Sequence, residues 1–283
     1  MKNEESLKRI LVPVDGSVSS LMAQETAAII AKKTEATVTV LHVMPEWRST
    51  HDLPSSVRNE IMGHVEQYGY DIISKAKALF TEESINVEER VFGGDPASGI
   101  LDLSGQDYSL VVMGACGEHE KDTCMLGSVT KKIIRHTRCP TFVVKKLSTL
   151  FNLLVCTDGS VHSIEALDFT AKLAEKIDAN IALLNVQERR LYRVSPKTAE
   201  DLGQRILSKT LEIVGKRKLK ISTKLEFGVP SDVIVEVAEN ENYDLIAIGS
   251  RGLGTADRFL LGSVSDDVSH KAKCSVLIIP PKV

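Results

Sequence analysis

The chain has 283 residues, of which 43% are hydrophobic and 26% charged, and this composition excludes a disordered or collagen-like protein. Its 35 basic and 38 acidic residues give a formal net charge of −3, which provides no overall attraction for nucleic acid or an anionic membrane. No apolar run approaches the roughly 18 residues of a membrane-spanning helix. We expect no signal peptide, because residues 1–8 have mixed charge and no cleavable apolar stretch follows them. The sequence therefore predicts a cytoplasmic protein with neither nucleic acid nor membrane among its partners.

The cysteines are odd in number and lack the regular spacing of a disulfide scaffold, so we expect reduced thiols. They are Cys116, Cys124, Cys139, Cys156 and Cys274. We expect Cys156 and Cys274, which lie in apolar runs, to be buried and slow to react. A Zn²⁺ site formed by Cys116, His119 and Cys124 is an alternative, but their spacing matches no zinc-finger pattern. We therefore expect no metal-ligating residues.

The chain contains an internal repeat, because Ile10–Ser17 returns as Leu153–Ser160 and places Asp15 and Asp158 143 residues apart. Further along, the offset falls to 135 residues, at which Gly114 corresponds to Gly249, Gly117 to Gly252 and Gly127 to Gly262. The first copy thus has about eight additional residues, which we place in the polar stretch from Pro45 to Ser56. Two domains are predicted, over residues 1–147 and 148–283.

Short β-branched runs alternate with segments of helical periodicity in each copy, a pattern typical of βαβ units and a parallel sheet. In the second copy the predicted strands are 153–156, 181–186, 221–227, 245–249 and 276–280. Their apolar residues are largely consecutive, so helices should cover both faces. Pro13 is expected near the end of the first strand, since it cannot donate to the ladder. The predicted fold class is α/β, with two tandem doubly wound domains, each an open five-stranded parallel sheet with about four helices.

The last predicted strand of each copy, 141–144 or 276–280, is apolar and would leave an exposed sheet edge in an isolated domain. We therefore expect the two copies to pack as a pseudo-twofold pair within one chain. A homodimer of the whole tandem chain is left open.

Glycine-rich segments after the fourth predicted strands carry the strongest functional signal. Gly249-Ser-Arg-Gly252 is followed after nine residues by Gly262-Ser263-Val264-Ser265, and the first copy repeats this spacing in Gly114-Ala-Cys-Gly117 and Gly127-Ser128-Val129-Thr130. Glycines let a backbone approach an anion and adopt positive φ, and a serine at a helix start adds a hydroxyl beside free N–H groups. The pattern predicts a phosphate cradle in each copy. The alternative is a pair of ordinary turns, with Ser263 as a helix N-cap.

These segments resemble the universal stress protein family, whose nucleotide-binding members carry the motif G-x2-G-x9-G-S/T. The resemblance covers nearly the whole chain as two tandem domains and implies a stress-response protein with ATP, ADP or AMP bound at the carboxyl ends of the strands. It implies that Asp15 and Asp158 contact ribose and that the backbone of Val43 and Val186 contacts adenine. The implied phosphate-binding residues are Gly117, Gly127, Ser128, Gly252, Gly262 and Ser263, and the full predicted sites add Gly114, Val129, Thr130, Gly249, Arg251, Val264 and Ser265. The alternative for the two aspartates is capping of the following helix.

The two copies differ in charge around this motif. Residues 250–261 carry Arg251, Arg258 and Asp257, a sum of +1, whereas residues 115–126 carry one lysine and three carboxylates, a sum of −2. Carboxylates beside a triphosphate oppose binding unless a metal ion such as Mg²⁺ bridges them. We therefore expect the second copy to bind nucleotide more tightly.

No enzymatic motif accompanies the glycine segments. The chain lacks the P-loop sequence with its phosphate-binding lysine. His42, at the end of the second predicted strand, is Asn185 in the other copy, so we expect a structural hydrogen bond there and no shared catalytic base. The prediction is a non-enzymatic protein with a regulatory adenine nucleotide. The alternatives are an interaction scaffold of the same fold that binds no nucleotide and a slow, metal-assisted ATPase.

Overall fold

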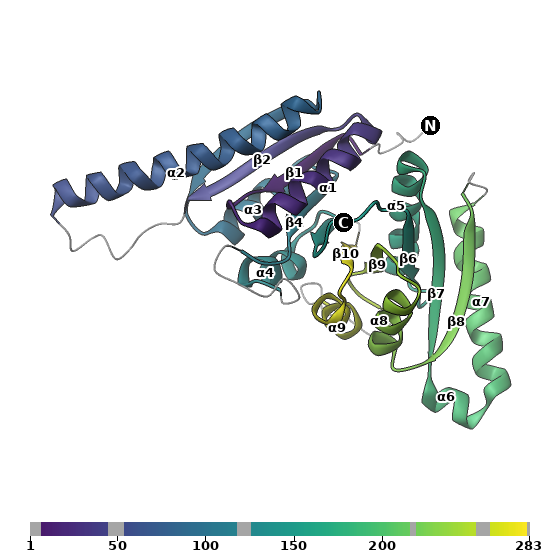
Figure 1. Ribbon diagram of the computed structural model, residues 1–283. Helices are drawn as coiled ribbons and strands as arrows, with labels where there is room; N and C mark the ends of the chain where they lie inside the picture. The colour runs from purple at the N-terminus through teal and green to yellow at the C-terminus, as the bar shows by residue number, and fades with distance from the viewer. Residues whose placement is uncertain (1–6, 45–53, 118–125, 216–218, 253–260, 282–283) are drawn as a thin grey trace.

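The computed structural model describes residues 7–44, 54–117, 126–215, 219–252 and 261–281 (Figure 1). The strands of the first copy are β1 (Arg9–Pro13), β2 (Thr37–Met44), β3 (Val87–Gly93), β4 (Leu110–Gly114) and β5 (Thr141–Val144). Those of the second copy are β6 (Asn152–Cys156), β7 (Asn180–Glu188), β8 (Ile221–Gly228), β9 (Leu245–Gly249) and β10 (Ser275–Ile279). The strands predicted for the second copy are confirmed with small shifts at their ends, and Pro13 is the last residue of β1.

The ten strands of the described ranges form one sheet, in the order β3-β2-β1-β4-β5-β10-β9-β6-β7-β8. Neighbours within each copy are parallel, whereas β5 and β10 pair antiparallel, with Phe142 opposite Leu277 and Val143 opposite Val276. The order is the same when read inward from either outer edge, so the two copies are arranged as a pseudo-twofold pair about the β5–β10 junction. This confirms the expected pairing of the two apolar edge strands.

Helices cover both faces of the sheet, as the consecutive apolar residues of the strands predict. The helices of the first copy are α1 (Val18–Thr34), α2 (Ser55–Glu82), α3 (Pro96–Ser104) and α4 (Ser128–His136). Those of the second copy are α5 (Val161–Ile177), α6 (Arg189–Val194), α7 (Pro196–Val214), α8 (Pro230–Asn240) and α9 (Ser263–Lys271). Buried side chains of α1, α2, α5 and α7 form one hydrophobic cluster that continues across both copies. Two separate clusters lie on the opposite face. One includes residues of α3 and α4, and the other includes residues of α8 and α9. Within the described ranges, no helix combines the length and apolar content required to span a membrane.

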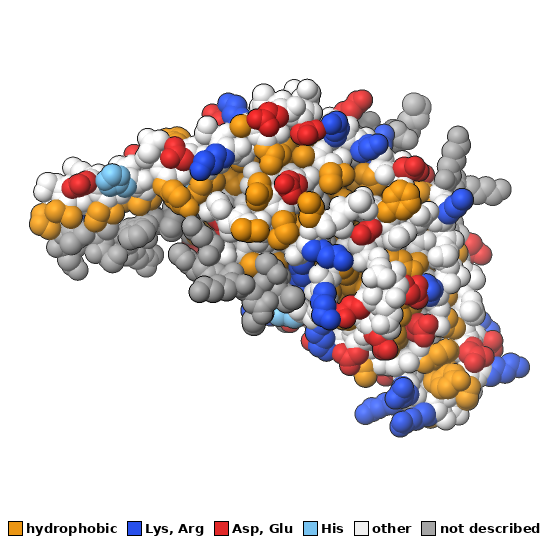
Figure 2. Space-filling view, viewed as in Figure 1, with side chains coloured by type: hydrophobic (Ala, Val, Ile, Leu, Met, Phe, Trp, Pro, Cys, Tyr) orange, Lys and Arg blue, Asp and Glu red, His pale blue; other side chains and the backbone are white. Residues whose placement is uncertain are grey.

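The predicted fold class is confirmed, and within the described residues the second copy has one short helix, α6, in addition to counterparts of the four helices of the first copy. The break between α6 and α7 falls at Ser195-Pro196, because a residue before proline is disfavoured in the helical conformation. Ser195 has φ −152° and its hydroxyl accepts a hydrogen bond from the N–H of Thr198, so it caps α7. Figure 2 shows Lys and Arg side chains gathered over α6, which contains Arg189, Arg190 and Arg193 and buries no side chain.

The connection after β2 is where the first copy has its additional residues. Gly69 of α2 packs on His42, and Gly203 of α7 packs on Asn185, so the two glycines are equivalent. The additional residues therefore lie between Met44 and Gly69. The predicted stretch from Pro45 to Ser56 falls within this interval, although residues 45–53 are outside the described part of the chain.

Candidate functional site

The loop after the first strand of each copy holds an aspartate in a fixed turn. Asp15 Oδ1 accepts a hydrogen bond from the N–H of Ser17, and Asp158 Oδ1 accepts one from the N–H of Ser160, each at 3.0 Å. The glycine between the aspartate and the serine has a positive φ in each copy, 87° for Gly16 and 81° for Gly159. This left-handed conformation favours glycine. The Asp-Gly-Ser sequence therefore builds a tight turn in which one carboxylate oxygen is held by the backbone.

The helices that follow are capped by the serines of these turns. Ser17 and Ser160 are the N-caps of α1 and α5, and their hydroxyls accept hydrogen bonds from the N–H groups of Ser20 and Ser163. The alternative interpretation of the aspartates as helix caps is therefore wrong. The second oxygen of each aspartate instead faces the glycine loop after the fourth strand.

That approach is close in both copies. A Cβ atom built on Gly252 would lie 2.6 Å from Asp158 Oδ2, and one built on Gly117 would lie 3.1 Å from Asp15 Oδ2. The loops after the first and fourth strands thus meet where the strand order reverses, between β1 and β4 and between β6 and β9. Ligands of open α/β sheets bind at this kind of switch point.

Two of the motif glycines have a packing role. A Cβ atom on Gly114 would lie 2.6 Å from Ser19 Oγ and 2.7 Å from the Ser19 carbonyl carbon, and one on Gly249 would lie 2.9 Å from the backbone of His162. Only glycine at the end of β4 or β9 therefore lets α1 or α5 pack this closely. Both glycines also line the cavities described below.

The expectation of positive φ is wrong for the motif glycines of the described chain. Gly127 and Gly262 have φ of −66° and −65°, and none of the others is among the residues with positive φ. Gly127 and Gly262 are the N-caps of α4 and α9, and no side chain caps either helix. The alternative of Ser263 as the cap is also wrong, because Ser263 is the first helical residue. Each helix therefore begins with backbone N–H groups that no side chain at the N-cap satisfies.

Hydroxyl groups one turn into these helices secure the loops to the strand ends. Thr130 Oγ1 donates to the carbonyl of Gly114 at 3.0 Å. Ser265 Oγ lies within donating distance of the carbonyls of Ser250 (3.0 Å) and Gly262 (2.8 Å). These hydroxyls, which were predicted as ligand contacts, make backbone hydrogen bonds that fix the start of each helix relative to the sheet.

A cavity lies at each of these places, with a volume of about 640 Å³ in the second copy and about 570 Å³ in the first. The predicted residues that line the second cavity are Asp158, Val186, Gly249, Arg251, Gly252, Gly262, Ser263, Val264 and Ser265. Those that line the first are Asp15, Val43, Gly114, Gly117, Gly127, Ser128, Val129 and Thr130. The structure thus brings each predicted set together around one cavity.

Residues of α2 and α7 also form a wall of each cavity, and the sequence motifs did not indicate them. His64, Val65 and Tyr68 of α2 line the first cavity, whereas Leu202 and Ile206 of α7 line the second. The sequence signal that could have found them is a glycine within each helical segment, Gly69 or Gly203. Aligning the two segments on these glycines makes Tyr68 of the first copy the counterpart of Leu202 in the second.

The two cavities differ at the residue before the second motif glycine. Arg251 lines the second cavity, whereas the buried Cys116 has the equivalent place in the first. The described residues therefore give the second cavity a positive charge that the first lacks at this position. The acidic residues Glu118, Glu120 and Asp122, together with Asp257 and Arg258, lie outside the described residues.

His42 and Asn185 have the same structural role. His42 Nδ1 lies 2.8 Å from the carbonyl oxygen of Val14, which can only accept, so Nδ1 carries the proton. Asn185 Nδ2 donates to the equivalent carbonyl, that of Thr157, at 2.7 Å. The predicted structural hydrogen bond at this position is confirmed in both copies.

Cys116, Cys139, Cys156 and Cys274 are free and buried, which confirms the expected burial of Cys156 and Cys274. The alternative zinc ligands His119 and Cys124 lie outside the described residues. Among the residues that the structure does describe, no cluster of three or more His, Cys, Asp and Glu side chains could hold a metal ion.

Native thiols are expected to react slowly. Burial raises the pKa of Cys139 to about 12 and that of Cys274 to about 11, and it raises the pKa of Cys156 as well. Because the thiolate is the reactive form, labelling of these residues should be at least ~100-fold slower in the native than in the unfolded protein at pH 8. The rate should rise about tenfold per pH unit below these pKa values. Mass spectrometry of labelled peptides can follow each site, and equal native and unfolded rates would contradict the prediction.

Comparisons with known proteins agree with this architecture. A model of the universal stress protein family matches residues 6–145 and again residues 150–280. A universal stress protein of Methanocaldococcus jannaschii is 31% identical over 149 residues, which are 52% of this chain and 87% of that protein. A relative from Staphylococcus aureus (strain USA300) is 30% identical over 140 residues, which are 46% of this chain and 84% of the relative's length.

A solved structure shows that the similarity extends to the whole fold. The crystal structure of a universal stress protein from Archaeoglobus fulgidus superposes with a TM-score of 0.77 at 23% sequence identity. The match covers 96% of this chain and 98% of the Archaeoglobus chain. Because the family model matches twice and covers nearly the entire sequence, this chain belongs to the universal stress protein family and contains two of its domains in tandem.

Proposed function

We propose that the protein binds an adenine nucleotide as a regulatory ligand at both switch points, more tightly in the second domain. The observation that carries the proposal is the convergence of Asp158 Oδ2 on Gly252, repeated by Asp15 Oδ2 on Gly117. This arrangement combines a carboxylate, which can accept hydrogen bonds from ribose hydroxyls, with an adjacent helix N-terminus, which attracts phosphate.

The dimensions of the cavities support a ligand of nucleotide size. Their volumes of about 640 and 570 Å³ lie within the usual range for small-molecule sites. Val186 and Val43 line the cavities at the end of the second strand of each domain, where the backbone would contact adenine. Gly252, Gly262 and Ser263, or Gly117, Gly127 and Ser128, would hold phosphates through their N–H groups and the serine hydroxyls.

Charge and polarity favour the second domain as the tighter site. Arg251 provides a guanidinium group at the cavity, where Cys116 stands in the first domain. Two amide side chains, those of Asn185 and Gln187, also line this cavity, and Gln187 Nε2 donates to Asn185 Oδ1 at 2.6 Å. A ligand with several phosphates should sense the added positive charge most strongly.

The proposed role is binding that alters stability or partner affinity, with no catalytic step. Mg²⁺ would enter with the phosphates of ATP and would neutralise part of their charge. A nucleotide-free interaction scaffold is the second candidate, and Cys116 in place of Arg251 favours it for the first domain alone.

Calorimetric titration of the full chain with ATP, AMP and adenosine, with and without Mg²⁺, tests the proposal. We expect a tight phase and a weak phase with ATP. A ligand at 100 times its dissociation constant should also stabilise the folded protein by roughly 2.7 kcal/mol, measurable as a rise in Tm. The absence of both heat and stabilisation at millimolar nucleotide would leave the scaffold as the function of both domains.

A further inference from the structure

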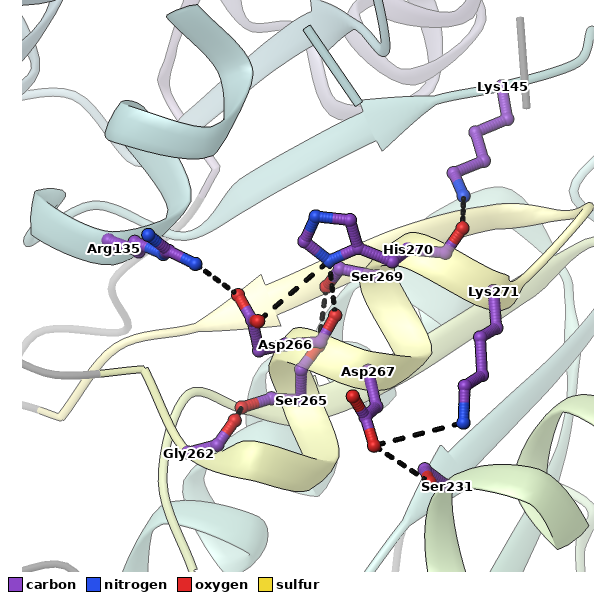
Figure 3. A network of polar contacts seen from close by, with 10 residues as sticks. All are labelled: Arg135, Lys145, Ser231, Gly262, Ser265, Asp266, Asp267, Ser269, His270 and Lys271. Carbon is purple, nitrogen blue, oxygen red and sulfur yellow. Dashed lines mark hydrogen bonds and ion pairs between the residues drawn. The ribbon is translucent and has the colours of Figure 1, made fainter. Parts of the chain in front are cut away.

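The helix that begins at the proposed phosphate site of the second domain is held by the first domain at both ends (Figure 3). Near its start, Arg135 of α4 donates from Nη2 to Asp266 Oδ1 of α9 at 3.1 Å. At its end, Lys145, which follows β5, donates from Nζ to the carbonyl oxygen of Ala272 at 2.6 Å. The position of α9 therefore depends on residues of the other domain.

Asp266 is an unfavourable residue for a phosphate site. It lies in the first turn of α9, and its N–H donates to the carbonyl of Gly262, the N-cap residue of the proposed cradle. Asp266 is three positions after Ser263, which places its backbone about 4.5 Å further along the helix axis. A carboxylate in the first turn of this helix would repel phosphates bound at its start unless a cation neutralises it.

Arg135 of the first domain supplies that cation. The second domain has no equivalent ion pair to the first domain at the corresponding positions. At the equivalent positions of the two helices, Arg135 corresponds to His270 and Asp266 to Lys131, so the mirrored pair cannot form the same ion pair. Lys145 likewise corresponds to Pro280, which has no donor for the end of α4. The first domain thus acts on α9, and the second domain makes no matching contact with α4 through these positions.

We propose that Arg135 of the first domain is a specificity-determining residue of the nucleotide site in the second domain, where it neutralises Asp266 beside the phosphates. The inference rests on the proposed nucleotide function. Arg135 acts through Asp266 and does not contact the ligand, so its effect should grow with the number of phosphates. The buried Lys145, only 4% exposed, fixes the far end of α9 and keeps Asp266 within reach of Arg135.

The test compares Arg135→Gln with Lys132→Gln in the full chain. Lys132 lies on the same helix, but its ion pair is with Asp95 of the first domain, at 3.8 Å. Arg135→Gln should weaken the tighter phase of ATP binding about fivefold and AMP binding less, and it should leave adenosine unchanged. Lys132→Gln should change none of these affinities. His270 Nδ1 also lies 3.9 Å from Asp266 Oδ2 and remains in the Arg135→Gln variant. In Arg135→Gln, the further change Asp266→Asn should restore ATP affinity, because it removes the carboxylate that has lost its arginine partner.

Two results would overturn the inference. One is equal ATP affinity of Arg135→Gln and Lys132→Gln, and the other is an equal loss of adenosine and ATP binding in Arg135→Gln, which would indicate a structural role. Failure of the proposed function would look different, because the unaltered protein would then bind none of the three ligands.

Discussion

Replacing Gly262 with valine should abolish the tighter phase of ATP binding, whereas Gly127→Val should leave that phase nearly unchanged. Gly262 has φ −65° and ψ 150°, a conformation open to any residue, and a Cβ atom there would lie 3.4 Å from Arg251 Cα, Ser250 O and Ser265 Oγ. The substitution is therefore compatible with the backbone. Its side chain would occupy the space through which a phosphate approaches the N–H groups of α9.

Calorimetric titration with and without Mg²⁺ measures the effect, and Tm without ligand shows whether each variant is folded. Loss of the tighter phase in Gly127→Val with its retention in Gly262→Val would show that the domains are ranked wrongly. The metal must be varied because Mg²⁺ can bridge carboxylates and phosphates and so mask the charge difference between the domains.

Phe142→Ala should cause the largest loss of stability among single changes at the domain junction. Phe142 lies on β5, is fully buried and faces Leu277 across the antiparallel pair that joins the domains. Truncation of a buried phenylalanine costs about 3–5 kcal/mol, since burial is lost and a cavity remains. Phe151→Ala is the matched control, because this side chain is 53% exposed and should contribute less than ~1 kcal/mol.

Urea unfolding monitored by circular dichroism gives both free energies. Because one hydrophobic cluster contains residues of both domains, we expect a single cooperative transition whose midpoint falls in Phe142→Ala. Two separate transitions, of which only one responds to the change, would contradict a shared core.

The sequence predicts the strands and the domain pairing well, because each signal occurs twice. The buried strands are runs of apolar residues whose positions agree between the copies, and both edge strands lack charged side chains that would protect an exposed edge. The division of the helical segment into α6 and α7 was not predicted. Ser195-Pro196 is a recognisable helix start, but the apolar periodicity before it is too short to indicate a separate helix.

The site is predicted in part. Motif spacing identifies the glycine loops and the aspartates, which follow strands that end at the same edge of a parallel sheet. Spacing does not reveal why a glycine is needed: Gly114 and Gly249 admit the backbone of a neighbouring helix, and Gly16 and Gly159 adopt positive φ. These reasons depend on tertiary packing. The walls formed by α2 and α7 depend on it too, since contacts of Gly69 and Gly203 set the position of each helix over the sheet.

The antiparallel junction of β5 and β10 joins two domains of one polypeptide. Residues at equivalent positions on the two sides of the junction can therefore differ. In a pair of identical subunits, every substitution appears on both sides of the axis, so an arginine on one side requires an arginine on the other. Here one gene encodes both sides separately. Arg135 and Asp266 can therefore be opposite charges at positions where the symmetry-related residues are His270 and Lys131. Covalent fusion also makes the pairing independent of protein concentration, so dilution leaves both cavities together in every molecule.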